Sequence, residues 1–160
     1  MDDYSRARAF LRAEKNSNWY TFEMTEIYHG TTQRGLGSIK PFKRFTPGGQ
    51  GLSGGIPPRI YATYVPAFAV AHSFPWSSDD GIDILVEGNT ITLVVPKNKQ
   101  VLLEQGVCIY TLPDSSFNFT EEEETGLTYH SAEAVQPSNC QCFSNVKAAM
   151  QYFSGKIKIM

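Results

Sequence analysis

Short runs of aromatic and β-branched residues, separated by glycine, proline and asparagine, recur along most of this chain. Such runs favour β-strands, and the residues between them favour turns. Gly88-Asn89 is the expected hairpin turn between two of the strands. Residues 101–103 fit either a short strand or a helical turn. The predicted strands are 20–28, 59–64, 82–87, 90–95, 107–112, a broken strand at 134–143, and 156–160.

Helical patterns are fewer than strand patterns. Residues 4–15 form an amphipathic pattern, residues 66–74 begin with a helix-starting Pro66 and end before Pro75, and residues 145–153 are a third candidate. The strict alternation of strand and helix that produces a parallel sheet is absent. The sequence therefore predicts an α+β fold with a split, mostly antiparallel sheet and few helices, in a single domain over residues 1–160.

Composition excludes several classes of function. The chain of 160 residues is 41% hydrophobic and carries a net charge of −2, which suits a packed core but gives no electrostatic basis for binding nucleic acid or an anionic membrane. No apolar run approaches the roughly 20 residues that span a bilayer. The first sixteen residues are too charged for the apolar region of a signal peptide. We therefore expect no membrane association and only weak affinity for nucleic acids.

The three cysteines, Cys108, Cys140 and Cys142, are an odd and sparse set. Such a set does not form a disulfide framework, so we expect a reducing, cytoplasmic environment. No second pair or nearby histidine completes four ligands around Cys140-x-Cys142, so no metal is expected. On a strand, these two side chains share one face and act as packing residues.

Two loops are candidates for binding other molecules. Residues 46–58 (TPGGQGLSGGIPP) are too rich in glycine and proline for a helix or central strand, and lack the Lys-Ser or Lys-Thr of a phosphate-binding P-loop. This segment is either a binding loop or a simple connection. Residues 114–125 contain the acidic run Glu121–Glu124, which fits a capped short helix or a solvated loop equally well.

The order of motifs along the chain is more specific than any one of them. His29-Gly30-Thr31 follows a predicted strand, Ile60-Tyr61-Ala62-Thr63 leads into an alanine-rich helix, and Tyr129-His130-Ser131-Ala132-Glu133 precedes a late strand. This arrangement resembles the ADP-ribosyltransferase superfamily, in particular the diphtheria-type toxins and the poly(ADP-ribose) polymerases. Those domains carry a histidine, a tyrosine and a glutamate on three strands of a split β-sheet that clamps NAD. The resemblance covers residues 26–160 by pattern rather than by close identity.

The resemblance implies a binding role for each matching residue. His29 would hydrogen-bond the adenosine ribose, and the backbone of Gly30, followed by Thr31, would hold the nicotinamide amide. Tyr61 would stack on the nicotinamide ring, as an aromatic face does on a flat cation. His72 falls where some polymerases place a second ring against nicotinamide. The ordinary alternatives are a core strand aromatic for Tyr61 and a half-buried helix residue for His72.

Glu133 is the catalytic carboxylate that the resemblance implies. It would bond the nicotinamide-ribose hydroxyl and stabilise the oxocarbenium ion that forms as nicotinamide leaves, which is where a fixed charge helps selectively. The ordinary alternative is a solvated surface charge. Ser131 stands where arginine-modifying members carry a further glutamate, which argues against arginine as the acceptor. The register of the family pattern around Ser131 and Glu133 stays open.

The leading hypothesis is an NAD-dependent mono-ADP-ribosyltransferase, or an NAD glycohydrolase if water is the acceptor. NAD is then the substrate, no metal is needed, and a protein is the favoured acceptor. The alternative is a catalytically inactive member of the same fold that binds a nucleotide or a protein partner. An RNA 2′-phosphotransferase ranks third, because no cluster of basic residues that would grip a phosphate is visible.

Overall fold

The computed structural model describes residues 26–42, 57–119 and 126–160. The predicted helix at 4–15, most of the glycine-rich segment 46–58 and the acidic run Glu121–Glu124 lie outside the described residues. The helices are α2 (Pro66–Ala71) and α3 (Val146–Tyr152), with 3₁₀ helices η1 (Ser78–Asp80) and η2 (Lys97–Glu104). The strands are β1 (Glu26–Thr31), β2 (Ile60–Ala62), β3 (Asp83–Glu87), β4 (Thr90–Val95), β5 (Val107–Pro113), β6 (Asn118–Phe119), β7 (Tyr129–Ser131), β8 (Asn139–Phe143) and β9 (Lys156–Ile159).

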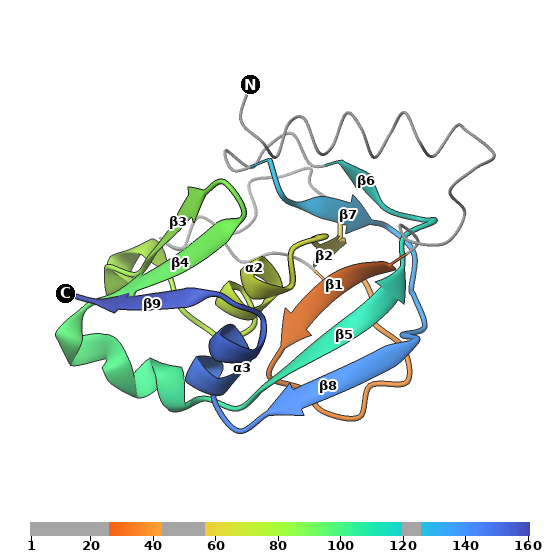
Figure 1. Cartoon of the computed structure of the whole chain (residues 1–160). Coiled ribbons are helices and arrows are strands. Elements are labelled where there is room, and N and C mark those ends of the chain that lie inside the picture. Colours follow the sequence, from red (N-terminus) through yellow and green to blue (C-terminus); the bar gives the residue numbers. More distant parts are fainter. Residues whose placement is uncertain (1–25, 43–56, 120–125) are drawn as a thin grey trace.

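These strands form three small sheets, with orders β1-β5-β8, β2-β7-β6 and β3-β4-β9, in the part of the chain that the structure describes (Figure 1). All the pairings within the sheets are antiparallel except β4 with β9, which is parallel. The predicted α+β class with mostly antiparallel sheet is confirmed. The expected hairpin is also present, and its turn uses Gly88 at a φ of 59°, a left-handed conformation that glycine adopts without strain.

The two helices lie between two of the sheets (Figure 1). Helix α2 contacts β1 and β5 on one side and β4 on the other, whereas α3 contacts β8 and β9. Asn145 starts α3 as an N-cap, because its side-chain oxygen accepts a hydrogen bond from the backbone N–H of Ala148 at 2.8 Å. The helices therefore join β1-β5-β8 to β3-β4-β9 into one packed unit.

Helix α2 ends earlier than predicted, at Ala71 instead of residue 74. The hydroxyl of Ser73 donates to the carbonyl of Val70 at 2.6 Å, and the indole N–H of Trp76 donates to the carbonyl of Ala71 at 2.7 Å. These side-chain donors bond carbonyls at the C-terminal end of the helix, in place of the backbone N–H groups that a further helical turn would supply. Pro75 has no N–H to donate to the carbonyl of Ala71, so the indole of Trp76 takes that place, and the helix ends before Pro75 as predicted but three residues earlier than expected.

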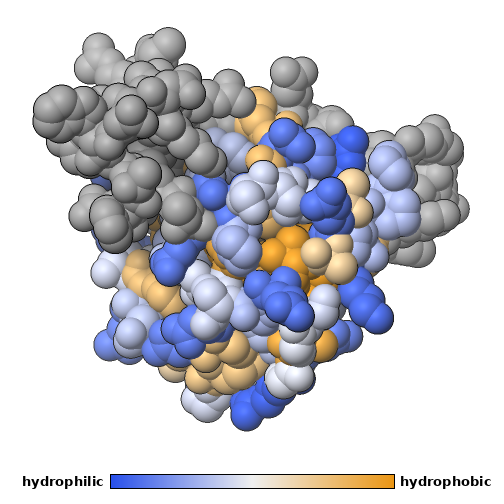
Figure 2. Space-filling view, turned by 90° about the vertical axis from the view of Figure 1, so that its right-hand side faces the viewer, coloured by the Kyte–Doolittle hydropathy of each residue, from blue (hydrophilic) through white to orange (hydrophobic). Residues whose placement is uncertain are grey.

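Strand β5 is buried on both faces, which explains its almost continuously apolar sequence. Val107 and Ile109 belong to the core beneath the helices, whereas Tyr110 and Leu112 face a second core that includes Ile27 of β1. Where residues are coloured, the side of the molecule shown in Figure 2 is mostly hydrophilic, with small apolar areas near its centre and in its lower part. The large hydrophobic side chains that are exposed among the described residues are Phe42, Leu85, Val101, Tyr152, Ile159 and Met160.

Several predicted elements differ in detail from the observed ones. Residues 101–103 lie in the 3₁₀ helix η2, and the broken strand 134–143 consists of β8 preceded by an isolated bridge between Val135 and Ile39. Strands β6 and β7 were not predicted, since two or three residues carry too short a pattern to recognise. No described helix is long and apolar enough to cross a membrane.

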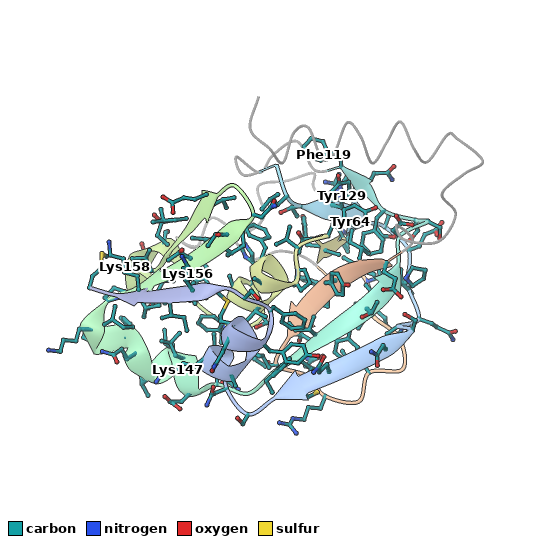
Figure 3. The ribbon with its side chains drawn as sticks, in the orientation of Figure 1. Tyr64, Phe119, Tyr129, Lys147, Lys156 and Lys158 are labelled. Carbon is teal, nitrogen blue, oxygen red and sulfur yellow. A yellow bond between two sulfur atoms is a disulfide. The ribbon has the colours of Figure 1, made fainter. Side chains whose placement is uncertain are left out.

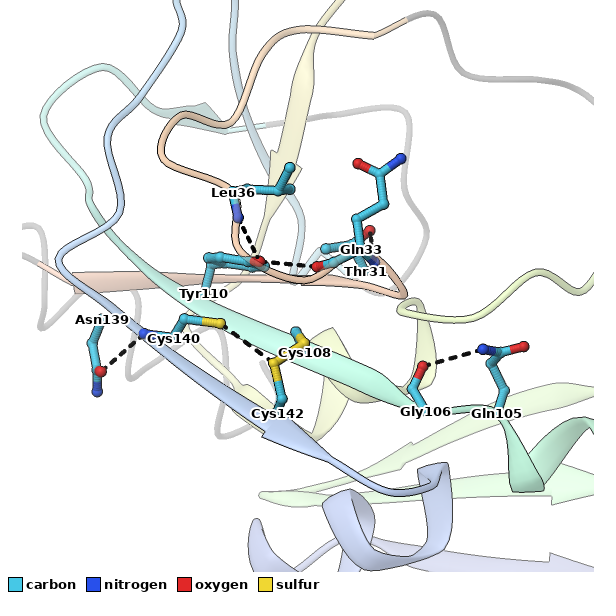
Figure 4. Close-up of a disulfide and its surroundings, with 10 residues drawn as sticks. All are labelled: Thr31, Gln33, Leu36, Gln105, Gly106, Cys108, Tyr110, Asn139, Cys140 and Cys142. Carbon is cyan, nitrogen blue, oxygen red and sulfur yellow. Dashed lines mark hydrogen bonds between the residues drawn. A yellow bond between two sulfur atoms is a disulfide. The ribbon is translucent and has the colours of Figure 1, made fainter.

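The cysteines contradict the sequence prediction. Cys108 and Cys142 form a disulfide between β5 and β8, where the two residues are directly opposite each other (Figure 4). Cys140 is a free thiol with an exposed side chain, so neither it nor Cys142 is a simple packing residue. The expectation of a reducing compartment depended on the absence of a disulfide, and the cysteine pattern no longer supports it.

Candidate functional site

A pocket of about 170 Å³ lies where β1, β2 and α2 meet. Strands β1 and β2 belong to different sheets and are joined directly by one bridge, in which Tyr28 and Thr63 exchange backbone hydrogen bonds of 2.8 and 2.9 Å. The pocket therefore sits at the junction of the two sheets. Its lining residues are Tyr28, His29, Gly30, Phe42, Tyr61, Ala62, Thr63, Phe68, Ala69, His72 and Thr128.

His29 links the two strands through its side chain. Its Nδ1 lies 2.7 Å from the backbone carbonyl oxygen of Tyr61, and the side chain is buried. A carbonyl can only accept, so Nδ1 carries the proton and Nε2 is an acceptor. Burial lowers the pKa of His29 below its ordinary value, and the hydrogen bond to Tyr61 opposes this only in part. The ring is therefore neutral at pH 7 and can accept a hydrogen bond from a ligand hydroxyl.

Gly30 has a structural reason to be glycine. A Cβ at this position would lie 2.2 Å from the carbonyl oxygen of Ala69 and 2.7 Å from the Cβ of Ser73, so α2 packs directly on the strand backbone. Strand β1 continues through Gly30 to Thr31, which corrects the prediction that His29 and Gly30 mark the end of a strand. The glycine brings α2, and with it Phe68 and His72, against the pocket.

Aromatic rings form much of the pocket wall. The ring of Phe42 lies 6.2 Å from that of His29 and 6.1 Å from that of Tyr61, measured between centroids. Phe42 reaches this place because its backbone pairs with Arg59, immediately before β2. Sequence reasoning missed Phe42, since nothing local distinguishes a phenylalanine beside a glycine-rich segment.

His72 stands just beyond the end of α2, and its exposed side chain lines the pocket. Its ring is 4.6 Å from Phe68 in an edge-on arrangement and stacks near Trp76 at 6.1 Å. The pocket therefore brings together four of the residues predicted from sequence, namely His29, Gly30, Tyr61 and His72.

Thr31 and Glu133 lie elsewhere. Thr31 is half-buried and accepts a hydrogen bond from the backbone of Gln33 at 3.2 Å. Glu133 is exposed and follows the last residue of β7 by two positions, and neither residue lines the pocket. The residue opposite Tyr61 in the β2–β7 register is His130. Among the described residues that line the pocket, none is acidic.

Three aromatic side chains, those of Tyr64, Tyr129 and Phe119, lie together near β2 and β7 (Figure 3). The hydroxyl of Tyr64 donates to the buried carboxylate of Asp114 at 2.5 Å. The ring of Tyr129 lies 4.9 Å from Tyr64 and 5.8 Å from Phe119. Burial, and then the Asp114 carboxylate, raise the pKa of Tyr64 well above its ordinary value, so the hydroxyl keeps its proton.

Comparison with protein-family models, with curated proteins and with solved structures finds no match. A functional assignment therefore depends on the residues of the pocket and on their chemistry.

Proposed function

We propose that the pocket binds the nicotinamide end of NAD, and that the protein is an NAD-dependent ADP-ribosyltransferase, or an NAD glycohydrolase when water is the acceptor. The supporting observation is that His29 and Tyr61, which are 32 positions apart and on different strands, line one pocket and are joined by a 2.7 Å hydrogen bond. A protein is the acceptor in this proposal, since the net charge of −2 does not favour nucleic acid.

The size and walls of the pocket suit a flat ring. Pockets that hold whole ligands of drug size measure roughly 300–1,000 Å³, whereas this pocket measures about 170 Å³. Only one end of a dinucleotide fits inside. Tyr61, Phe42 and His72 offer ring faces and edges on which a positively charged aromatic ring can pack.

The protonation state of His29 suits a sugar hydroxyl. A neutral imidazole with its proton on Nδ1 accepts through Nε2, and a ribose hydroxyl is a good donor to such an atom. An imidazolium would have no acceptor to offer and would repel the positively charged nicotinamide ring. The buried setting of His29 therefore favours binding of NAD.

Catalysis in this proposal depends on Glu133. A carboxylate near the ribose stabilises the positive charge that develops as the bond to nicotinamide breaks. Glu133 is exposed and outside the pocket in this structure, so it would act only after the bend beyond Ser131 turns it towards the bound ribose. The hydrogen bond from the backbone N–H of Glu133 to the Ser131 hydroxyl, 3.2 Å long, fixes the present bend.

One observation favours a second candidate function, a catalytically inactive nucleotide-binding module. No acidic residue is among the described residues that line the pocket. A neutral, aromatic pocket with a histidine acceptor is sufficient for binding a nucleotide, but it lacks the charge that would promote departure of nicotinamide.

Two variants separate binding from catalysis. Tyr61→Ala should weaken NAD binding by about tenfold or more, because a ring face is lost in the ground state and the transition state alike. Glu133→Gln should leave NAD affinity nearly unchanged and lower the rate of nicotinamide release by on the order of a hundredfold. Calorimetry measures the affinity, and chromatography of nicotinamide measures turnover. Tyr152→Ala and Glu87→Gln, at exposed positions away from the pocket, are the matched controls.

The outcomes distinguish the two functions. Binding of NAD without release of nicotinamide, with or without added protein acceptors, would support the inactive module. Turnover by Glu133→Gln at the wild-type rate would exclude Glu133 as the catalytic carboxylate. Absence of NAD binding by the wild type would exclude the enzyme and an NAD-binding module.

A further inference from the structure

Three sulfur atoms meet at the outer edge of the β1-β5-β8 sheet. Cys142 of β8 lies opposite Cys108 of β5, and Cys140 is two residues earlier on β8, so its side chain emerges on the same face. The three Sγ atoms lie within 4.8 Å of one another, and those of Cys140 and Cys142 are 3.7 Å apart (Figure 4). None of these residues lines the pocket at the junction of β1 and β2.

This cluster has two chemical states. In the oxidised state Cys108 and Cys142 share a disulfide, and Cys140 is the remaining thiol. A dithiol reductant transfers two electrons and two protons to the disulfide, becomes a disulfide itself, and leaves three thiols on the protein. Only the reduced state offers three separate sulfur ligands.

We propose that the reduced protein binds one zinc-type ion through the thiolates of Cys108, Cys140 and Cys142, and that formation of the disulfide abolishes the site. Each thiol loses its proton on binding, so one divalent ion replaces up to three protons. No electron is transferred in the binding step. A water molecule completes the four ligands that zinc prefers.

The spacing of the sulfurs supports this assignment. Zinc–sulfur bonds of about 2.3 Å in a tetrahedral site place two sulfurs about 3.8 Å apart. Cys140 and Cys142 already have their sulfurs 3.7 Å apart. Once the disulfide is reduced, the Cys108 sulfur moves from bonding distance to ordinary contact distance, which is the spacing that the third ligand requires.

The surroundings also suit an ion. Strand β5 is the central strand of its sheet, and Cys108 is fully buried on it, so one ligand is held rigidly away from water. Cys140 and Cys142 are exposed on the edge strand β8 and provide an entry path. The prediction of no metal considered only the Cys140-x-Cys142 pair, because the third sulfur lies 34 positions before Cys142 and reaches it through strand register.

The test uses the full chain in two redox states. The reduced protein is titrated with Zn²⁺ in competition with a chromogenic chelator, and with Co²⁺, whose thiolate charge-transfer absorption reports the number of bound sulfurs. We expect one ion per chain, proton release on binding, and a three-sulfur Co²⁺ spectrum. The oxidised protein should bind no ion at the same concentrations.

Cys140→Ala is the decisive variant, because Cys140 is exposed and its substitution leaves the core intact, whereas Cys108 is buried. It should lower Zn²⁺ affinity by more than about a hundredfold. Removal of a residue that only hydrogen-bonds a metal ligand lowers affinity by about 10- to 100-fold, so a larger loss identifies Cys140 as a ligand itself. Ser144→Ala, at an exposed position just after β8, is the matched control. Equal affinities of wild type and Cys140→Ala, or equal binding by the oxidised and reduced proteins, would overturn the proposal.

Discussion

His29 makes the free energy of unfolding depend on pH, because the folded protein buries this histidine as a neutral ring. The unfolded chain takes up a proton on this histidine near its ordinary pKa of about 6.5, whereas the folded chain does so only at lower pH. As pH falls through that window the unfolded state binds more protons, so the free energy of unfolding decreases. Above the ordinary pKa of histidine, this group contributes no pH dependence.

Urea unfolding between about pH 8 and about pH 5 measures this effect. His29→Gln should show a shallower decline than the wild type, by at most about 1.4 kcal/mol per pH unit, which corresponds to one proton. Identical slopes for the two proteins would mean that the pKa of His29 is not lowered in the folded state.

Gly30 is the second residue whose identity the structure explains. Gly30→Ala should lower the free energy of unfolding by about 1–3 kcal/mol, because the new Cβ meets the backbone of α2, which cannot move without disturbing the helix. Gly37→Ala is the control, since no atom lies within 4 Å of a Cβ there. Thermal unfolding of both variants checks this, and equal stabilities would contradict the close packing of α2 on β1.

At the scale of elements, α3 begins at a capping side chain, that of Asn145. Asn145→Ala removes the acceptor for the Ala148 N–H and should lower the free energy of unfolding by about 1 kcal/mol. Asn145→Asp keeps an acceptor at the cap and should be nearly neutral. Chemical denaturation compares the two variants, and a larger loss for Asp than for Ala would show that the cap is not the stabilising contact.

Elements formed by local patterns were predictable, and elements formed by distant pairing were not. The hairpin of β3 and β4 follows from two alternating runs around Gly88-Asn89, and its strands were predicted to within one residue. By contrast, β7 has only three residues, and its place beside β2 depends on pairing with a segment far away in sequence. The extension of β1 beyond His29 likewise depends on β5, which supplies its partners as far as Cys108.

The same distinction applies to the site. His29 directly follows one predicted strand and Tyr61 lies within another, so the order of motifs along the chain singled both out, and both line one pocket. Phe42 was missed because its place in the pocket depends on a backbone bridge to Arg59. Glu133 lies outside the pocket because the chain bends after Ser131. The disulfide was missed for a similar reason, since strand register sets which cysteines meet.

For the whole molecule, the disulfide between Cys108 and Cys142 closes a loop of 34 residues. In the chain-entropy model, such a loop stabilises the folded state by about 3–4 kcal/mol. Thermal unfolding of Cys140→Ser with and without a reductant should therefore show a clearly lower Tm when reduced. This background removes the third thiol, so that exchange among the sulfurs does not complicate the comparison. An unchanged Tm would mean that the disulfide contributes little to stability.

Two contacts hold the junction of the two sheets: the backbone pair between Tyr28 and Thr63, and the hydrogen bond between His29 and the carbonyl of Tyr61. Residues of β1 and β2 also share one buried core, in which Ile27 lies with Ile60 and Ala62. The positions of His29 and Tyr61 relative to each other are therefore set by the fold before a ligand arrives, and the site is preorganised. A ligand that binds there loses no binding free energy to bringing the two strands together.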